Sequence, residues 1–122
     1  MTNLFLDISS TCTGITIASS EDDTVTIHDT YPLWFPKNVN IEDKCYFLFE
    51  HIISDIHPTY VIENIIYEKY SFNMRQPNGS LALPNLIGAV MTASVEIGAS
   101  IEDITPQTWR SQCGIKFVKN ET

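Results

Sequence analysis

Short apolar runs alternate with polar turns over the first third of the chain. Three of these runs are rich in apolar and β-branched residues and predict strands: residues 3–8, 14–19 and 25–29. A polar turn, SSTCT, joins the first two, and the run DDT at 22–24 marks a hairpin tip before the third. The segment 31–39 contains two prolines and predicts a loop. The chain therefore opens with a predicted antiparallel meander.

A helical period follows this loop. Asn40 is a suitable N-cap, and the carboxylates of Glu42 and Asp43 suit the positive end of a helix. Apolar residues then keep a helical spacing at Ile41, Cys45, Leu48, Ile52 and Ile56. Pro58 predicts the end of this helix. The run 59–68, TYVIENIIYE, is rich in β-branched and aromatic residues and predicts a fourth strand.

The second half of the chain alternates loop, helix and strand. A polar loop at 69–80 precedes a predicted helix over 84–98, which begins with a proline and ends at a glycine. Residues 101–104 predict a short strand, and 105–114 predict a last helix. The order β-β-β-α-β-α-β-α predicts an α/β fold with a mixed five-stranded sheet, because helical crossovers place later strands parallel to the first. We expect one domain over 1–122.

Composition and charge narrow the class of protein. The 122 residues include 7 Lys and Arg against 15 Asp and Glu, a formal net charge of −8. This charge argues against a passive nucleic-acid binder with a basic face, and it is compatible with carboxylates gathered around a divalent metal ion. Polar residues interrupt every apolar stretch, so we expect no contact with a membrane. Three cysteines without a CxxC pair and no secretion signal predict a cytoplasmic protein.

One carboxylate lies inside the first apolar run. Asp7 is followed by the turn residues SSTCT and then by Gly14. If the fourth predicted strand lies beside the first, a carboxylate at the same level on that strand is about 5 Å away. Two carboxylates so placed can share Mg²⁺, a hard ion that prefers oxygen ligands. The structural alternative is that the Asp7 carboxylate accepts hydrogen bonds from the turn.

The fourth predicted strand offers two partners for Asp7. Glu63 and Glu68 are separated by an odd number of residues, so a regular strand points them to opposite faces and only one can face Asp7. Glu68 ends the strand, where ligands of α/β folds usually bind. We therefore favour Glu68 and keep Glu63 as the alternative.

Three longer segments occur in a particular order: LFLDISSTCTGITIA, IYEKYSFNMRQPNGSLALPNLIGAV and DITPQTWRSQCGI. In this order they resemble three parts of RuvC-type Holliday-junction resolvases, of the RNase H-like superfamily, in their phage and bacterial form. These parts are the first strand and hairpin, the second acidic strand with its loop and helix, and the PxxW(K/R) segment. The shorter run YVIENI, around Glu63, also resembles the acidic strand of the cellular resolvases.

The resemblance implies an RNase H-like fold and a metal-dependent endonuclease that resolves four-way DNA junctions in recombination. Asp7 and Glu68, with Glu63 as the alternative, would be catalytic, and the first two would hold Mg²⁺ or Mn²⁺. It also implies a homodimer, working in the host cytoplasm if the protein is phage-encoded. The family's remaining catalytic acids lie on a helix beyond the PxxW(K/R) segment, whereas this chain stops at Thr122. We therefore expect a truncated piece of a longer resolvase.

The loop after the fourth predicted strand combines aromatic rings with cations. Five residues are candidates for DNA contact: Lys69, Tyr70, Phe72, Arg75 and Arg110. In the resemblance, one of the two rings enters the junction centre, where pairing is already broken. The alternative for both rings is packing on the domain. In the proline loop, Trp34 and Phe35 are expected to pack rather than to bind.

Two other functions stay open. One is a catalytically silent module that binds branched DNA or a recombination partner, which the charge of −8 and the missing C-terminal acids favour. The other is a phosphate-handling enzyme of the actin, Hsp70 and sugar-kinase type, whose phosphate loop also follows an aspartate in the first strand. That fold needs a second, similar half, for which 122 residues leave no room.

Overall fold

A five-stranded mixed sheet carries helices on one of its faces. The computed structural model describes residues 1–68 and 82–104. Its elements, in chain order, are β1 (Thr2–Ile8), β2 (Cys12–Glu21), β3 (Thr24–Trp34), α1 (Ile41–Glu50), the π-helical η1 (His51–Ile56), α2 (His57–Tyr60), β4 (Asn64–Glu68), α3 (Ala82–Ile97) and β5 (Ser100–Ile104). The strands lie in the order β3-β2-β1-β4-β5. The pairs β1–β2 and β2–β3 are antiparallel, and β1–β4 and β4–β5 are parallel, as the sequence predicts.

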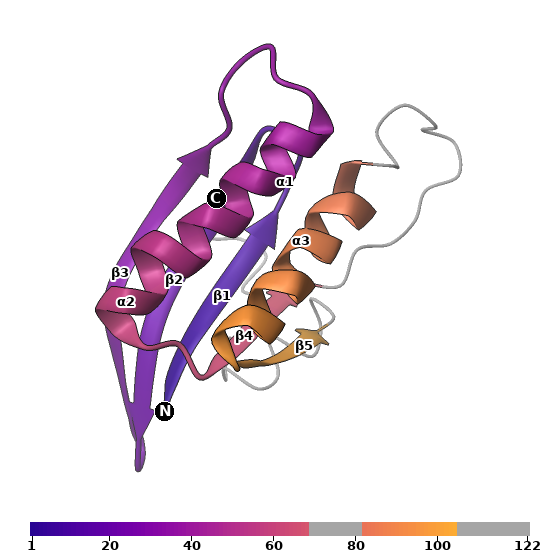
Figure 1. Cartoon of the computed structure of the whole chain (residues 1–122). Coiled ribbons are helices and arrows are strands. Elements are labelled where there is room, and N and C mark those ends of the chain that lie inside the picture. The colour runs from indigo at the N-terminus through magenta and orange to yellow at the C-terminus, as the bar shows by residue number, and fades with distance from the viewer. Residues whose placement is uncertain (69–81, 105–122) are drawn as a thin grey trace, which may run out of the picture.

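The helices divide the sheet into a covered face and an open face. Helices α1 and α3 lie side by side across the covered face (Figure 1), and α1 continues through η1 into α2. We call the other side of the sheet the open face, because no described helix crosses it. We call the border of the sheet formed by the C-terminal ends of β1, β4 and β5 the carboxyl edge. The amino edge is the opposite one, where these strands begin and where the β2–β3 hairpin turns.

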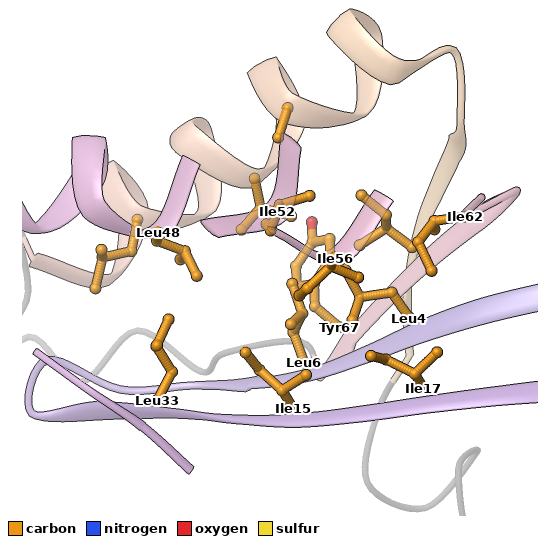
Figure 2. Close-up of a cluster of buried hydrophobic side chains, with 14 of the residues drawn as sticks. Leu4, Leu6, Ile15, Ile17, Leu33, Leu48, Ile52, Ile56, Ile62 and Tyr67 are labelled. Carbon is orange, nitrogen blue, oxygen red and sulfur yellow. The ribbon is translucent and has the colours of Figure 1, made fainter. Parts of the chain in front are cut away.

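The core fills the space between the sheet and the helices. Every second residue of the strands points to it, and Figure 2 shows these side chains facing those of the helices. Its fully or almost fully buried members include Leu4, Leu6, Ile15, Ile17, Leu48, Ile52, Ile56 and Ile65. Because strand side chains alternate, the residues between these positions project from the open face.

Strand β3 is longer than the sequence pattern suggests. It continues to Trp34, so the predicted loop at 31–39 is wrong for its first four residues. Pro32 pairs with Gly14 of β2 inside this strand. A proline is compatible here because β3 is an edge strand, and edge positions tolerate the loss of one N–H donor.

The first helix also continues beyond its predicted end. It passes through Pro58 and ends only at Tyr60. The segment His51–Ile56 is π-helical, and the His57 N–H donates to the carbonyl oxygen of Ile52, five residues earlier. Pro58 then falls in the first turn of α2, where a missing N–H costs least.

Strand β4 is shorter than predicted because the helix occupies its expected beginning. Val61 ends α2 with a φ of 52°, in the left-handed region, and its N–H donates to the His57 carbonyl oxygen over 2.8 Å. The strand begins only at Asn64. Its side-chain amide donates to Asn3 Oδ1 over 3.0 Å and accepts from the Ser100 hydroxyl. These bonds tie β1, β4 and β5 together at the amino edge.

A chain of polar groups fastens the edge strand β3 to the helix. The Tyr31 hydroxyl and His51 Nε2 are 2.7 Å apart, and His51 Nδ1 lies 2.9 Å from Asp55 Oδ2. Burial, followed by the negative charge of Asp29, raises the pKa of Tyr31 to about 12. The phenol therefore stays protonated at neutral pH, and its hydroxyl links β3 to the ring of His51.

The later predicted elements are partly described. The predicted helix over 84–98 corresponds to α3, and the predicted strand 101–104 corresponds to β5. The predicted loop 69–80 and the helix predicted at 105–114 lie outside the described residues. None of the helices in the described ranges is long and apolar enough to cross a membrane.

The left-handed residues at the two helix ends give a stability prediction. Val61 at φ 52° is β-branched and exposed, whereas Gly98 takes the same role after α3 with φ 73°. Left-handed backbone costs a non-glycine residue about 1–2 kcal/mol, and glycine loses about 0.5–1 kcal/mol of that in chain entropy. Val61→Gly should therefore raise the free energy of unfolding by about 0.5–1 kcal/mol, measured by urea denaturation.

The matched control is Gly98→Val, which should lower the free energy of unfolding by about 0.5–1 kcal/mol, since the left-handed cost is again partly offset by the lower chain entropy of valine. A Cβ at Gly98 would meet no atom within 4 Å, so steric crowding does not contribute. A lower stability of Val61→Gly than of the wild type would contradict the strain argument.

Candidate active site

Asp7 and Glu68 lie on neighbouring strands at the carboxyl edge. Leu6 of β1 is opposite Tyr67 of β4 in the parallel register, so the next residue on each strand, Asp7 and Glu68, lies at the same level. Adjacent strands are about 4.8 Å apart. Leu6 and Tyr67 point into the core, and alternation therefore sends Asp7 and Glu68 to the open face, where both are exposed.

Gly14 leaves the other flank of Asp7 clear. It is the partner of Asp7 in the antiparallel register of β1 and β2. A Cβ built on Gly14 would lie 3.4 Å from the Cβ of Asp7, and a longer side chain would extend over the open face beside the carboxylate. Glycine at this position therefore keeps space for a group that approaches Asp7.

The turn between β1 and β2 satisfies itself without Asp7. The Ser9 N–H donates to the Cys12 carbonyl oxygen over 3.1 Å, and the Cys12 N–H donates to Ser9 Oγ over 3.2 Å. Within residues 1–68 and 82–104, no hydrogen bond or ion pair engages the carboxylate of Asp7 or that of Glu68. The structural alternative for Asp7, a carboxylate that accepts hydrogen bonds from the turn, is therefore not what these residues form.

Helix α1 and the loop before it hold this turn in place. Lys44 Nζ donates to the Ser10 carbonyl oxygen over 2.7 Å and lies 5.9 Å from the centre of the Phe35 ring. The Phe35 N–H donates to the Thr11 carbonyl oxygen over 3.1 Å. Sequence reasoning missed Lys44. The available signal was a lysine in a first helical turn otherwise occupied by acids.

Glu63 lies at the opposite edge of the sheet. Its N–H donates to the Thr2 carbonyl oxygen over 2.9 Å, and the Thr2 N–H approaches Glu63 Oε1 at 3.4 Å. Five residues of strand separate Glu63 from Glu68, about 16 Å at the usual rise. Asp7 is therefore level with Glu68 and not with Glu63. Another acid, Glu102 of β5, pairs with Ile66 and so lies on the open face, two residues further from the carboxyl edge than Glu68.

The predicted DNA contacts fall outside the described residues: Lys69, Tyr70, Phe72, Arg75 and Arg110. Within the described ranges, no group of three or more His, Cys, Asp or Glu side chains is able to hold a metal ion. Asp7 and Glu68 are a pair, and their carboxylate oxygens are the ligand type that Mg²⁺ and Mn²⁺ prefer. Their exposure and the space at Gly14 are compatible with such an ion.

The prediction that Trp34 and Phe35 pack on the domain is right for only one of them. Phe35 is buried and belongs to the core, as predicted. Trp34 does not pack there: it ends β3 with 63% of its surface exposed. Leu33 points into the core, so Trp34 projects from the open face, the side on which Asp7 lies.

The lysines of the described ranges lie at one edge, whereas acids lie at both. Lys37 and Lys44 are the two Lys or Arg residues in the described ranges, and both lie near the carboxyl edge, between the end of β3 and the first turn of α1. The hairpin tip at the amino edge carries three consecutive acids, Glu21, Asp22 and Asp23. Glu63 adds a fourth carboxylate there.

Comparisons with known proteins give structural matches. No protein-family model and no curated protein matches this chain. The chain is similar to Thermus thermophilus RuvC in complex with a Holliday junction substrate, with a TM-score of 0.80 and 14% identity, over 91% of this chain and 70% of that one. A second Thermus thermophilus RuvC structure has a TM-score of 0.80 and 16% identity, over 99% and 75%.

The yeast mitochondrial Holliday junction resolvase Ydc2 is also similar, with a TM-score of 0.66 and 14% identity, over 93% of this chain and 56% of that one. Identities this low establish the fold. The chain has the RuvC-type RNase H-like fold, with the mixed five-stranded sheet that the sequence predicts.

Removal of the Lys44 ammonium should loosen the turn beside Asp7. Lys44→Met keeps the aliphatic stem and loses the bond to Ser10, worth about 0.5–1.5 kcal/mol. Amide hydrogen exchange at Ser9 and Phe35 should accelerate about 2- to 10-fold. Lys37→Met, a change in the exposed loop, is the matched control and should leave these amides unchanged. Equal exchange in the wild type and Lys44→Met would show that the lysine does not hold the turn.

Proposed function

We propose that this chain is the nuclease domain of a metal-dependent, structure-specific endodeoxyribonuclease that resolves branched DNA such as Holliday junctions in recombination. The observation that carries the proposal is the Asp7–Glu68 pair, level on adjacent parallel strands and exposed on the open face. The similarity to RuvC in complex with a junction substrate supports the choice of DNA. The RuvC-type fold alone does not fix an activity, so the argument rests on these residues.

The pair is suited to a divalent cation. In the proposal Asp7 and Glu68 hold Mg²⁺ or Mn²⁺ through their carboxylate oxygens. A cation bound there supplies Lewis-acid activation of water and stabilisation of a leaving oxygen. The residues of the chain position the reactants: Gly14 leaves room for a phosphodiester beside Asp7, and Lys44 fixes the turn next to it.

The residues proposed to contact DNA come directly after strands that end at the carboxyl edge. Glu68 and Ile104, the last described residues before the two remaining segments, both end strands at the carboxyl edge. Lys69, Tyr70, Phe72 and Arg75 come after the first of them, and Arg110 after the second. In the proposal the cations contact phosphates, and one of the two rings enters the junction centre.

The first test is cleavage of a synthetic four-way junction in Mg²⁺ by the full-length protein. Asp7→Asn and Glu68→Gln should each lower the cleavage rate more than about 100-fold, since each removes a ligand oxygen's charge. Glu102→Gln, on the same face one strand away, is the matched control and should leave the rate within about 2-fold.

The outcomes separate the candidate functions. Loss of cleavage in Glu63→Gln but not in Glu68→Gln would show that the wrong acid is paired with Asp7. Junction binding by the wild type without cleavage in Mg²⁺ or Mn²⁺ would select the catalytically silent module instead. Cleavage by Asp7→Asn at the wild-type rate would reject the proposed site.

A homodimer is part of the proposal, because a four-way junction presents two equivalent strands to cut. Gly88, Met91 and Val95 lie on one stripe of α3. Met91 and Val95 are 44% and 81% exposed, and a Cβ at Gly88 would meet no atom within 4 Å. Such a stripe allows two copies of α3 to approach closely around a two-fold axis.

The dimer prediction is tested by analytical ultracentrifugation. Val95→Glu places two like charges near the proposed axis and should raise the dimer dissociation constant at least about 10-fold. Val25→Glu, an equally large change on the exposed part of β3, is the control and should not alter it. Identical sedimentation of wild type and Val95→Glu as dimers would place the interface elsewhere.

A further inference from the structure

We infer that Trp34 stacks on an unpaired base of the DNA and so holds the substrate strand beside the candidate active site. The inference rests on the proposed function and adds a binding residue to it. It commits to one occupant of the exposed indole, a nucleotide base, for three reasons: the position of the ring, its lack of a packing role in the described core, and the charge around it.

The position follows from the register of three strands. Trp34 pairs with Cys12, and two residues along, Pro32 pairs with Gly14, which in turn pairs with Asp7. Trp34 is therefore two strands across from Asp7 and two residues nearer the end of β3. With about 4.8 Å between strands and about 3.3 Å per residue, the two Cα atoms are roughly 12 Å apart. That distance corresponds to three or four nucleotide steps of about 3.4 Å.

Phe35, the residue after Trp34, provides the aromatic packing at the end of β3. Phe35 is 7% exposed, meets Phe47 edge to face at 6.1 Å between ring centres, and receives Lys44 on its face. Trp34 has 63% of its surface exposed and makes no ring contact with described residues. An indole left in water at the end of a strand buries little apolar surface and contributes little to folding.

Two lysines near Trp34 are able to contact the phosphates of a bound strand. Lys37 follows it by three residues in an exposed loop, and Lys44 lies over Phe35. These are the two Lys or Arg residues of the described ranges, in a chain with a net charge of −8. Surfaces for single-stranded DNA combine such cations with an aromatic ring on which a base stacks. An apolar protein partner would not require cations here.

Stacking on Trp34 implies a preference within branched substrates. A base is free to stack only where it is unpaired, at a branch point or an open arm. The indole face accepts any base, so it confers a preference for structure without a preference for sequence. We therefore expect tighter binding of junctions that carry unpaired nucleotides at the branch than of fully paired duplex.

The experiment measures junction affinity by fluorescence anisotropy in Ca²⁺, with the full-length protein. Trp34→Ala should weaken binding of a four-way junction with two unpaired nucleotides at the branch about 5- to 100-fold. Trp34→Phe, which keeps a ring, should recover most of that loss. Ile27→Ala, an exposed position on the far part of the same strand, is the matched control and should bind as the wild type does.

Two further readouts make the test independent of cleavage. In a Trp109→Phe background only Trp34 remains as indole, and its emission should be quenched on junction binding and not on duplex binding. Unchanged affinity and unchanged emission, with Asp7→Asn still abolishing cleavage, would overturn this inference and leave the proposed function standing. Loss of cleavage with unchanged affinity in Trp34→Ala would also overturn it. Absence of any DNA binding by the wild type would remove both.

Discussion

The hydrogen-bonded register between the parallel strands β1 and β4 places the two acids of the candidate site. It sets Leu6 opposite Tyr67, and through strand alternation it brings the next residues, Asp7 and Glu68, to one level on the open face. A slip of one residue on either strand would turn its acid toward the core. The register is held by burial of Leu4, Leu6 and Ile65 and by the Asn3–Asn64–Ser100 hydrogen bonds at the far edge. The candidate site and the folded sheet thus depend on the same pairing.

The helical layer contributes to the site from a distance. Helix α1 begins near the carboxyl edge, so its first turn reaches the polar turn after β1. Lys44 Nζ and the Phe35 N–H donate to the carbonyl oxygens of Ser10 and Thr11 in that turn. The turn therefore does not draw on the Asp7 carboxylate for its hydrogen bonds. This matters for metal binding, because a carboxylate that already accepts structural hydrogen bonds is a weaker ligand for a metal ion. The open face stays clear at Gly14, where the backbone alone separates Asp7 from β3.

Periodicity predicted most of the fold, since alternation and helical spacing report burial directly. It failed where neighbouring context overrides local composition. The run TYVIE, residues 59–63, has the composition of a strand. The helix nevertheless continues through the π-helical segment and past Pro58, and the chain turns at Val61. Glu63 therefore lies at the amino edge. Pro32 and Pro36 suggested a loop, although Pro32 lies within the edge strand β3. Without that strand, the sequence did not predict that Trp34 projects into solvent. The role of Lys44 could not be predicted from the sequence, because its partner is the backbone carbonyl of a residue 34 positions away. The level of Asp7 with Glu68, by contrast, followed from the strand order.

Carboxylates outnumber lysines at both ends of the described strands. Glu21, Asp22 and Asp23 lie at the hairpin tip, and near the ends of β1 and β4 the two lysines, Lys37 and Lys44, are accompanied by the acids Asp7, Glu42, Asp43 and Glu68. The net charge of −8 therefore repels any polyanion during diffusional encounter. Dissolved salt weakens this repulsion within a Debye length of about 8–10 Å, so it should speed the approach of a polyanion, whereas it slows the approach to a basic surface.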